Sequence, residues 1–545
     1  MLVVSKILSL PRPSSFNKVC VDSIAYNELN TFGWVSDMKT DVLFFSIRSI
    51  GLSFLLIASA GAYQDPTKNS VSLKGSPTDG SAVDIADRRE LFVDDLLIGK
   101  MTETQLKLHS PQKLRRQPPR PFGHYATVLY EPLLDDGGKL RLYYRGDKVP
   151  GAHWRNGWAK YHEGEVTLYA ESVDGGWTWN EPDLKIHRVP EMPKGNVVLD
   201  MSKDTFGVTH NFTPFIDSRP DVPKNESYKA LGGIKFPLPN WGGWKEGERE
   251  AVVKQYGDDG LKAFASSDGL SWKLLKKQPV ISTKWGNFDS QNVAFWSKAE
   301  QQYVCYFRWF DKGWRSIRRT TSKDFLNWTE PVEMQGREPK EHLYTNGTHP
   351  YFRAPHIYIA LPTRFQASAG SITDICLMST RPGSDRYHRQ FKEAFIRPGL
   401  GPRGWSNRAN YITLNVVPTS STEMSMFMFG GAQYVLRMDG FISVHAGFKP
   451  GIFETKPIRF SGSKLEINYS TSGAGSIKVE LIDEDRNPIE GFRLDDCDAI
   501  KGDAIAGRVT WKNRSDVSKL AGKPIILRFV MSEADLYSLR FPKAD

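Results

Sequence analysis

The chain has 545 residues, too many for one ordinary hydrophobic core, so two or more domains are expected. Hydrophobic residues make up 40% of it and charged residues 25%, which is ordinary globular composition. The net charge of +10 favours an anionic partner, such as nucleic acid, anionic lipid or an acidic polysaccharide, although scattered solvated side chains would give the same total. The densest basic cluster, at 113–121, carries no zinc-finger, helix-turn-helix or RNA-binding signature, which argues against nucleic acid.

The N-terminal region has the features of an export signal. Basic residues precede an apolar run at 50–62 that ends in Ala60-Gly61-Ala62, an A-x-A cleavage pattern. Such a signal normally begins near the initiator, so Met38 is the more natural start and residues 1–37 are interpreted as an extension. A secreted or periplasmic protein is therefore predicted. An uncleaved membrane anchor is the alternative, for which the apolar run is short.

A polar linker is expected at 63–87, and a repeated unit follows it. Each unit has an apolar strand, a turn, a second strand rich in Tyr and Phe, and a turn with Ser, then Asp two residues on, then Trp. The clearest copies of this turn contain Asp174, Asp268 and Asp324. Units of four short strands at intervals of about 50 residues predict propeller blades. Five units, the fifth weaker, are counted over 88–447.

The repeated Asp has a structural interpretation. A short carboxylate can accept hydrogen bonds from backbone N–H groups two residues on and fix a tight turn. Gly175 and Gly269 can adopt a positive φ in these turns. The Trp that follows is expected to pack between neighbouring sheets. We therefore predict that these Asp residues hold hairpins at the outer rim and are not catalytic.

The pattern changes near the C-terminus. Residues 448–545 contain alternating antiparallel strands with Gly and Asx turns and none of the repeated turns, which predicts a β-sandwich. Such a module could bind sugar or brace the propeller. The predicted fold class is all-β, a five-bladed β-propeller followed by a C-terminal β-sandwich.

Polar residues at the starts of the first strands are the candidates for a site, because these strands converge on the axis of a propeller. A histidine in such a place is also consistent with a strand end whose hydrogen bonds are satisfied. The candidates for substrate binding are His124, His210, Asn211, Asn292, His342, Asn346, Arg408 and Asn410, with Tyr344 beside them.

The segments FDSQNVAFWSKAEQQYVCYFRW, at 288–309, and HNFTPFIDSRPDVPKNESYKALGG, at 210–233, resemble the five-bladed propeller glycoside hydrolases of families 32, 43, 62 and 68. The pattern from RELFVDDLLI to ADLYSLRF is similar to exported bacterial proteins described as family-32-like. The resemblance covers about 88–545 and is architectural. It implies three carboxylates from separate blades, with one protonated and another ionised beside the glycosidic bond.

Where family 32 places its nucleophile in an Asn-Asp-Pro-like first-blade motif, this chain has PFGHYATV, with His124 and no acid. The remaining catalytic candidates each have a structural alternative. For Asp289 it is a turn or a sugar hydrogen bond, and for Glu423, which opens an apolar strand, it is a salt bridge to an arginine such as Arg408. Asp217 also fits an ordinary Asx-Pro turn, and Glu341 is the weakest candidate of the four.

Three functions remain open from the sequence. The first is an exported glycoside hydrolase acting on a poly- or oligosaccharide, for which an anionic sugar would suit the charge. The second is a non-catalytic carbohydrate-binding or surface-interaction propeller, which the missing first-blade acid favours. The third is a sialidase, although those enzymes have six blades, an arginine triad and usually a Phe-Arg-Ile-Pro segment that this chain lacks.

No cofactor and no metal ion are predicted. His349 and His356 do not form a ligand set with nearby acids, and no loop demands Ca²⁺. The cysteines are too widely spaced for a disulfide framework or a CxxC site. Cys305 and Cys376 lie in apolar runs and are predicted to be buried thiols.

Overall fold

The computed structural model describes residues 82–114, 124–133, 138–148, 164–202, 205–236, 247–337 and 340–543. The predicted export signal at 1–62 and most of the linker at 63–87 lie outside these ranges. The described residues are almost entirely strands and loops, which confirms the all-β class. Their helices are α2 (Glu248–Tyr256) and the short 3-10 turns η3 (Lys224–Glu226), η4 (Ala367–Ala369), η5 (Pro402–Trp405) and η6 (Ser518–Leu520). No helix within these ranges has both the length and the hydropathy to cross a bilayer.

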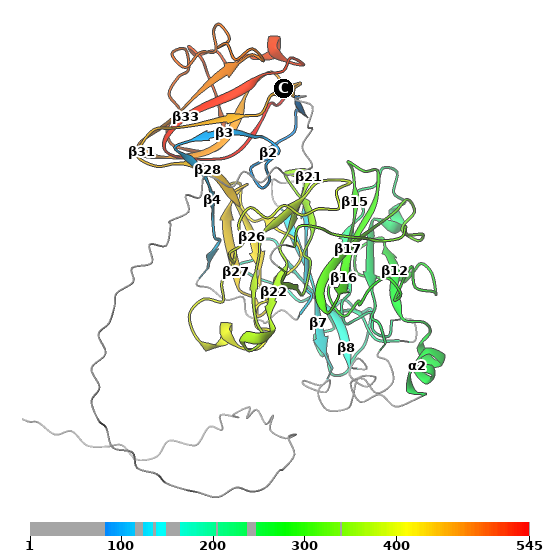
Figure 1. The fold of residues 1–545 in the computed structure, drawn as a ribbon. Coiled ribbons are helices and arrows are strands. Elements are labelled where there is room, and N and C mark those ends of the chain that lie inside the picture. The colour runs from blue at the N-terminus through cyan, green and yellow to red at the C-terminus, as the bar shows by residue number, and fades with distance from the viewer. Residues whose placement is uncertain are drawn as a thin grey trace, which may run out of the picture. The chain divides into compact units, whose positions relative to one another are not determined.

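Three antiparallel sheets follow one another along the chain, each with four strands in sequence order. The first contains β6 (Thr127–Pro132), β7 (Gly138–Asp147), β8 (Glu165–Ser172) and β9 (Val197–Leu199). The second contains β10 (Thr213–Ile216), β11 (Tyr228–Gly232), β12 (Gly260–Ser266) and β13 (Lys273–Leu274), and β14 (Ile281–Ser282) pairs with the start of β12. The third contains β15 (Val293–Ser297), β16 (Gln302–Asp311), β17 (Trp314–Ser322) and β18 (Val332–Glu333). Figure 1 shows β15, β16 and β17 of this sheet in green.

A fourth unit divides into two three-stranded sheets. One contains β20 (His349–Tyr351), β21 (Ala354–Ala360) and β24 (Met378–Thr380), and the other contains β19 (His342–Leu343), β22 (Thr363–Gln366) and β23 (Ile372–Ile375). Pro362 stands between β21 and β22, where a residue without an N–H cannot extend the ladder. The division therefore follows from the sequence of what would otherwise be one long second strand.

The fifth unit is completed by a strand from the N-terminal part of the chain. Its own strands are β25 (Val417–Pro418), β26 (Glu423–Phe427) and β27 (Gln433–Arg437). The outer position is filled by β5 (Gln112–Lys113), which pairs with β27 through Gln112 opposite Val435 and Lys113 opposite Tyr434.

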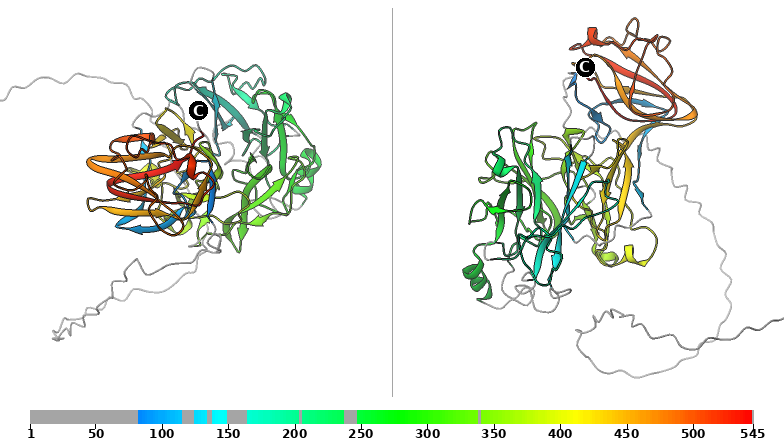
Figure 2. Two further views of the ribbon diagram at one scale, coloured as in Figure 1. Left: turned by 90° about the horizontal axis from the view of Figure 1, so that it is seen from above. Right: turned by 180° about the vertical axis from the view of Figure 1, so that it is seen from behind.

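The first strands of the units contact one another in chain order. β6 lies against β10, β10 against β15, and β15 against β20, while β25 lies against β6. His349 in β20 accepts a hydrogen bond from the backbone N–H of Val416, just before β25, at 3.1 Å. In the view from above in Figure 2, the cyan to green sheets follow one another along an arc. Because the sheets are antiparallel, first and third strands begin at the end where second strands finish.

The repeated Ser-x-Asp turns connect third and fourth strands. They therefore lie at the end of each sheet where third strands finish, opposite to the end where first strands begin. The carboxylates of Asp174, Asp268 and Asp324 each accept hydrogen bonds from backbone N–H groups two to four residues on. Trp272, from the second of these turns, packs edge to face against Tyr143 of the first sheet, with ring centroids 6.4 Å apart. The predicted structural role of these turns is confirmed.

The C-terminal strands form an eight-stranded sheet, drawn mainly in orange and red in Figure 1. It contains β2 (Glu90–Leu91), β3 (Ile98–Thr102), β4 (Thr104–Leu108), β28 (Ile442–Ala446), β29 (Gly451–Thr455), β31 (Glu466–Ile482), β32 (Asp503–Arg508) and β33 (Ile526–Arg540), while β1 (Val83–Ala86) and β30 (Ile458–Phe460) form a separate parallel pair. The pairing of β31 with β33 shifts register between Thr471 and Ser476, which lets both long strands bend.

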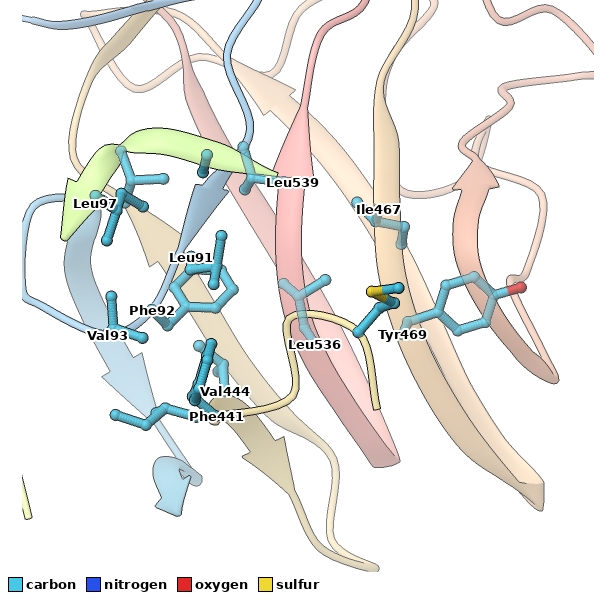
Figure 3. Packing of buried hydrophobic residues seen from close by; sticks show 14 of the residues in the cluster. Leu91, Phe92, Val93, Leu97, Phe441, Val444, Ile467, Tyr469, Leu536 and Leu539 are labelled. Carbon is cyan, nitrogen blue, oxygen red and sulfur yellow. The ribbon is translucent and has the colours of Figure 1, made fainter. Parts of the chain in front are cut away.

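Four strands of this sheet, β2, β3, β4 and β28, come from the range 88–447 that the sequence predicts as the propeller. β2, β3 and β4 pair with β33, β29 and β28, so the sheet draws on the chain before residue 110 as well as after 440. This differs from the predicted boundaries at residues 88 and 448, because an alternating pattern predicts a strand but not its partner. Figure 3 shows the result: Leu91, Phe92, Val93 and Leu97 pack against Phe441, Val444, Leu536 and Leu539.

A buried ionic network ties the fourth unit to the C-terminal sheet. The carboxylate of Asp439, fully buried, accepts hydrogen bonds from Tyr351 Oη at 2.8 Å, Arg353 Nη1 at 2.8 Å and Ser538 Oγ at 2.6 Å. Arg89 Nη1 lies 3.5 Å from the same carboxylate. A buried charge of this kind is tolerated because several donors surround it.

We predict that Asp439→Asn lowers the free energy of unfolding by about 3–5 kcal/mol, because Arg353 and Arg89 would lose their buried counter-charge. Asp503→Asn, which removes an ion pair to Arg437 at a largely exposed carboxylate, is the control and costs about 1 kcal/mol or less. Chemical denaturation of the purified variants measures both. Equal losses would contradict the role given to Asp439.

Candidate functional site

The polar residues that precede the first strands gather at one end of the units, which we call the mouth. His124 and Tyr125 come just before β6, His210 just before β10, and Asp289 just before β15. Glu165, the first residue of β8, lies at the same end because third strands run in the same direction as first strands.

The centre of the mouth is an imidazole between two carboxylates. His210 Nδ1 lies 3.0 Å from Glu165 Oε1, and His210 Nε2 lies 2.9 Å from Asp289 Oδ1. The side chains of His210 and Glu165 are only 3% and 2% exposed, whereas that of Asp289 is 35% exposed. Asp289 is thus the member of this cluster that solvent or a ligand can reach.

Arg145 gives His210 two possible arrangements. Its Nη1 lies 2.8 Å from His210 Nδ1 and 3.4 Å from Glu165 Oε1, and its Nη2 lies 3.3 Å from His124 Nδ1. A guanidinium only donates, so neutral His210 accepts from Arg145 at Nδ1, whereas protonated His210 donates from Nδ1 to Glu165. In both arrangements Nε2–H donates to Asp289.

The surroundings favour the protonated arrangement. Burial alone lowers the pKa of His210 and Arg145 acts in the same direction, but the carboxylates of Glu165 and Asp289 outweigh both and raise it above its usual range. An imidazolium then holds two carboxylates from different sheets in fixed positions.

Two asparagines that the sequence predicts as substrate-binding residues hold the backbone around Asp289 by hydrogen bonds. The amide nitrogens of Asn211 and Asn292 both donate to the carbonyl oxygens of Phe288 and Ser290, on either side of Asp289, at 2.5–3.0 Å. Arg308, from the end of β16, lies beside the carboxylate, with Nη2 3.5 Å from Asp289 Oδ2. Asn211 and Asn292 therefore position Asp289 and are themselves buried.

Aromatic rings surround this charged centre. Tyr125 has a positive φ of 57°, unusual for a residue with a side chain and a kind of strain that often occurs at functional sites. Its ring lies 5.6 Å from that of His210 and 6.0 Å from that of Tyr411. The ring of Tyr344 lies 5.5 Å from that of Tyr411, and His124 stacks on Phe429 at 4.2 Å. Such rings provide flat apolar faces beside a polar centre.

Three of the four predicted acids lie away from this cluster. Glu423 is exposed at the start of β26, a second strand, and therefore at the opposite end from Phe429. Asp217 follows β10 at that opposite end and is buried between Tyr303 Oη, at 2.7 Å, and Lys229 Nζ, at 2.9 Å.

Glu341 is engaged in structural ion pairs. Its carboxylate oxygens lie 3.0 Å from Arg364 and 2.6 Å from Arg389. Arg408, proposed from the sequence as a partner for Glu423, instead lies over the ring of Phe365 at the mouth, 5.3 Å from its centroid. The alternative interpretation of Glu423 as the partner of Arg408 is therefore wrong.

Three further residues that the sequence predicts for substrate binding instead form hydrogen bonds with the protein backbone. Asn346 is buried and donates to the backbone oxygens of Gln291 and Tyr306, and Asn410 donates to those of Thr373 and Gly404. His342 is partly buried beside Trp314, and its Nδ1 accepts a hydrogen bond from the N–H of Arg315 at 3.2 Å.

Sequence reasoning missed Glu165, Arg145, Arg308 and Arg315. They occupy the starts of third strands or the ends of second strands, which also reach the mouth, whereas the prediction covers only the starts of first strands. Each of them is a charged residue near one end of a strand rich in buried residues, and this pattern indicates a residue at the mouth. Within the described ranges no cluster of three or more His, Cys, Asp or Glu side chains is arranged to hold a metal ion.

No protein-family model matches the sequence, and no curated protein matches it. Similar solved structures include one described as a glycoside hydrolase, with 10% identity, a TM-score of 0.37, and 61% of this chain and 91% of that chain covered. A family-32 β-fructofuranosidase from Bombyx mori shares 10% identity over 80% of this chain and 94% of its own, with a TM-score of 0.35. A β-1,2-mannobiose phosphorylase from Listeria innocua shares 11% over 58% and 90%, with a TM-score of 0.37. These values assign no activity to this chain.

We predict that Glu165→Gln lowers the pKa of His210, because its largest favourable charge interaction is lost. Nitrogen-15 NMR titration of labelled histidines measures this, with His187 in the same spectra as the internal control. In the wild type the raised pKa stabilises the fold fully below the unfolded value of about 6.5, and this stability is lost as the pH rises through the folded pKa. An unchanged His210 pKa in the variant would contradict the account.

Proposed function

We propose that this chain is a carbohydrate-active enzyme that cleaves a glycosidic bond at the mouth. The proposed architecture is a closed five-bladed propeller followed by a β-sandwich. The order of contacts between first strands and the completion of the fifth unit by β5 support the ring. Five units rather than six also favour this reading over a sialidase.

One observation carries the proposal: Asp289 is a partly exposed carboxylate whose position is fixed from three directions. His210 holds one oxygen at 2.9 Å, Arg308 lies 3.5 Å from the other, and buried asparagines hold the adjoining backbone. A carboxylate fixed in this way can act as the base or nucleophile of glycoside hydrolysis. Glu165 does not contact the substrate and positions His210.

The tyrosines of the mouth support the charged centre from within. Tyr125 and Tyr411 are only 8% and 3% exposed, and they pack on one another and on Tyr344. Burial raises the pKa values of both well above the usual range, so neither adds a negative charge beside Asp289.

The test is hydrolysis of a panel of poly- and oligosaccharides by the wild type and two variants. Asp289→Asn keeps the shape of the side chain but removes the base, so a loss of about 10²–10⁴-fold in kcat is expected. Glu423→Gln changes an exposed carboxylate at the opposite end and should retain the wild-type rate. Cleavage that survives Asp289→Asn at the full rate would refute the assignment.

A non-catalytic carbohydrate-binding propeller is the second candidate. It is favoured by the state of Glu165, the other carboxylate of the central cluster, which is 2% exposed and paired with Arg145 and His210. Saturable glycan binding without any product, measured by calorimetry and chromatography of the same samples, would select this function instead.

Export through the N-terminal signal is part of the proposal. The apolar run and the Ala60-Gly61-Ala62 pattern support cleavage after Ala62. N-terminal sequencing of the protein from a secreting host is expected to begin at Tyr63. A membrane-bound product that retains the apolar run would instead show an uncleaved anchor.

A further inference from the structure

We propose that the mouth recognises a carboxylate on an acidic sugar through Arg308, Arg315 and Arg408. This inference rests on the proposed carbohydrate function and names the class of sugar that the site takes. The three arginines come from the end of β16, the start of β17 and the segment before β25, so two different units supply them.

The three guanidinium groups alternate with aromatic rings. Arg308 and Arg315 lie over the ring of Tyr344, 5.4 and 4.8 Å from its centroid. Arg315 and Arg408 lie over the ring of Phe365, at 4.9 and 5.3 Å. The rings therefore occupy the faces of the guanidinium groups and leave their N–H edges for other partners.

Two of the three guanidinium groups lack an anionic partner among the described residues, whereas Arg308 lies beside Asp289. Among the residues that the structure describes, neither Arg315 nor Arg408 forms an ion pair with a carboxylate, and the Nε–H of each is buried without a hydrogen-bond acceptor. Arg308 Nη1 is likewise buried and unsatisfied in that part of the chain. Arg219, Arg319 and Arg389 also leave an Nε–H unsatisfied, but each is paired with a carboxylate. Arg318 leaves one unsatisfied too, but it lies apart from this cluster, over the ring of Trp309.

The cluster is therefore electrostatically costly without a ligand. Burial lowers the pKa of Arg315, and the positive charges of Arg308 and Arg408 add to this, with partial compensation from Tyr344. A guanidinium stays protonated in proteins, so the three positive charges remain close together. A bound anion would offset their repulsion and satisfy the unused N–H groups.

The geometry favours a carboxylate as that anion. A planar guanidinium edge matches the two oxygens of a carboxylate, as in bidentate arginine–carboxylate pairs. Arg308 also contacts Asp289, so the acidic group would bind next to the proposed catalytic carboxylate. The positive charge of Arg308 between them would reduce the repulsion that two neighbouring carboxylates otherwise experience.

The test is isothermal titration calorimetry of the full-length protein with tetragalacturonate and with its fully methyl-esterified form, which has the same sugar but no charge. The acid is expected to bind at least about tenfold more tightly than the ester. Titration with sialyllactose and with lactose shows whether a sialic acid fits the site better than a galacturonic acid. A sulfated neutral galactan oligosaccharide shows whether the arginines prefer a sulfate to a carboxylate. Equal affinity for acid and ester, with no preference for sialyllactose over lactose, would overturn the proposal, as would preference for the sulfated sugar.

Arg315→Met is the decisive variant, and Arg188→Met, at an exposed arginine, is its control. Arg315→Met should reduce acid binding about tenfold or more and leave binding of the ester unchanged. Its Tm should equal or exceed that of the wild type, because a partly buried charge without a carboxylate partner is removed, whereas Arg389→Met should lower the Tm by breaking an ion pair with Glu341. A fall in Tm for Arg315→Met like that for Arg389→Met, with acid binding intact, would assign Arg315 a structural role.

The calorimetric result is independent of turnover. Preferential binding of the acid without hydrolysis would leave this inference standing and reject the enzyme proposal. If the protein hydrolyses a neutral sugar and Arg315→Met does not change the rate, the enzyme proposal stands and this inference is rejected.

Discussion

The imidazole of His210 holds together carboxylates from two different sheets, and the centre of the mouth depends on that contact. Glu165 comes from the first sheet and Asp289 precedes the third, so the three residues are far apart in the chain. Two carboxylates near one another repel unless a positive group separates them. His210 and Arg145 supply that charge on one side, and Arg308 supplies it on the other.

Strand direction explains which parts of the site could be predicted from the sequence. The prediction places the site at the starts of first strands, and His124, His210, Asp289 and Arg408 lie together there at the mouth. Glu423 lies at the other end because it begins a second strand, and an apolar run alone does not show its order in a sheet. The Ser-x-Asp turns were predictable because their hydrogen bonds are local in the sequence.

Pairing between distant segments was the part that the sequence could not provide. β5 and β2 to β4 belong to sheets whose other strands lie hundreds of residues later, and alternation does not identify a partner. The sequence also does not show that Arg315 and Arg408 are neighbours. In the structure both guanidinium groups lie over the ring of Phe365. Isolated arginines near strand ends are usually solvated, and only their proximity makes the mouth strongly positive.

A crystal structure of the Asp289→Asn protein with tetragalacturonate would test the central claim most directly. The account predicts a sugar in the mouth, with one carboxylate within hydrogen-bond distance of Arg315 or Arg408 and a glycosidic oxygen beside residue 289. An oligosaccharide bound only elsewhere, such as the groove lined by His445, Phe448 and Glu533, would contradict it.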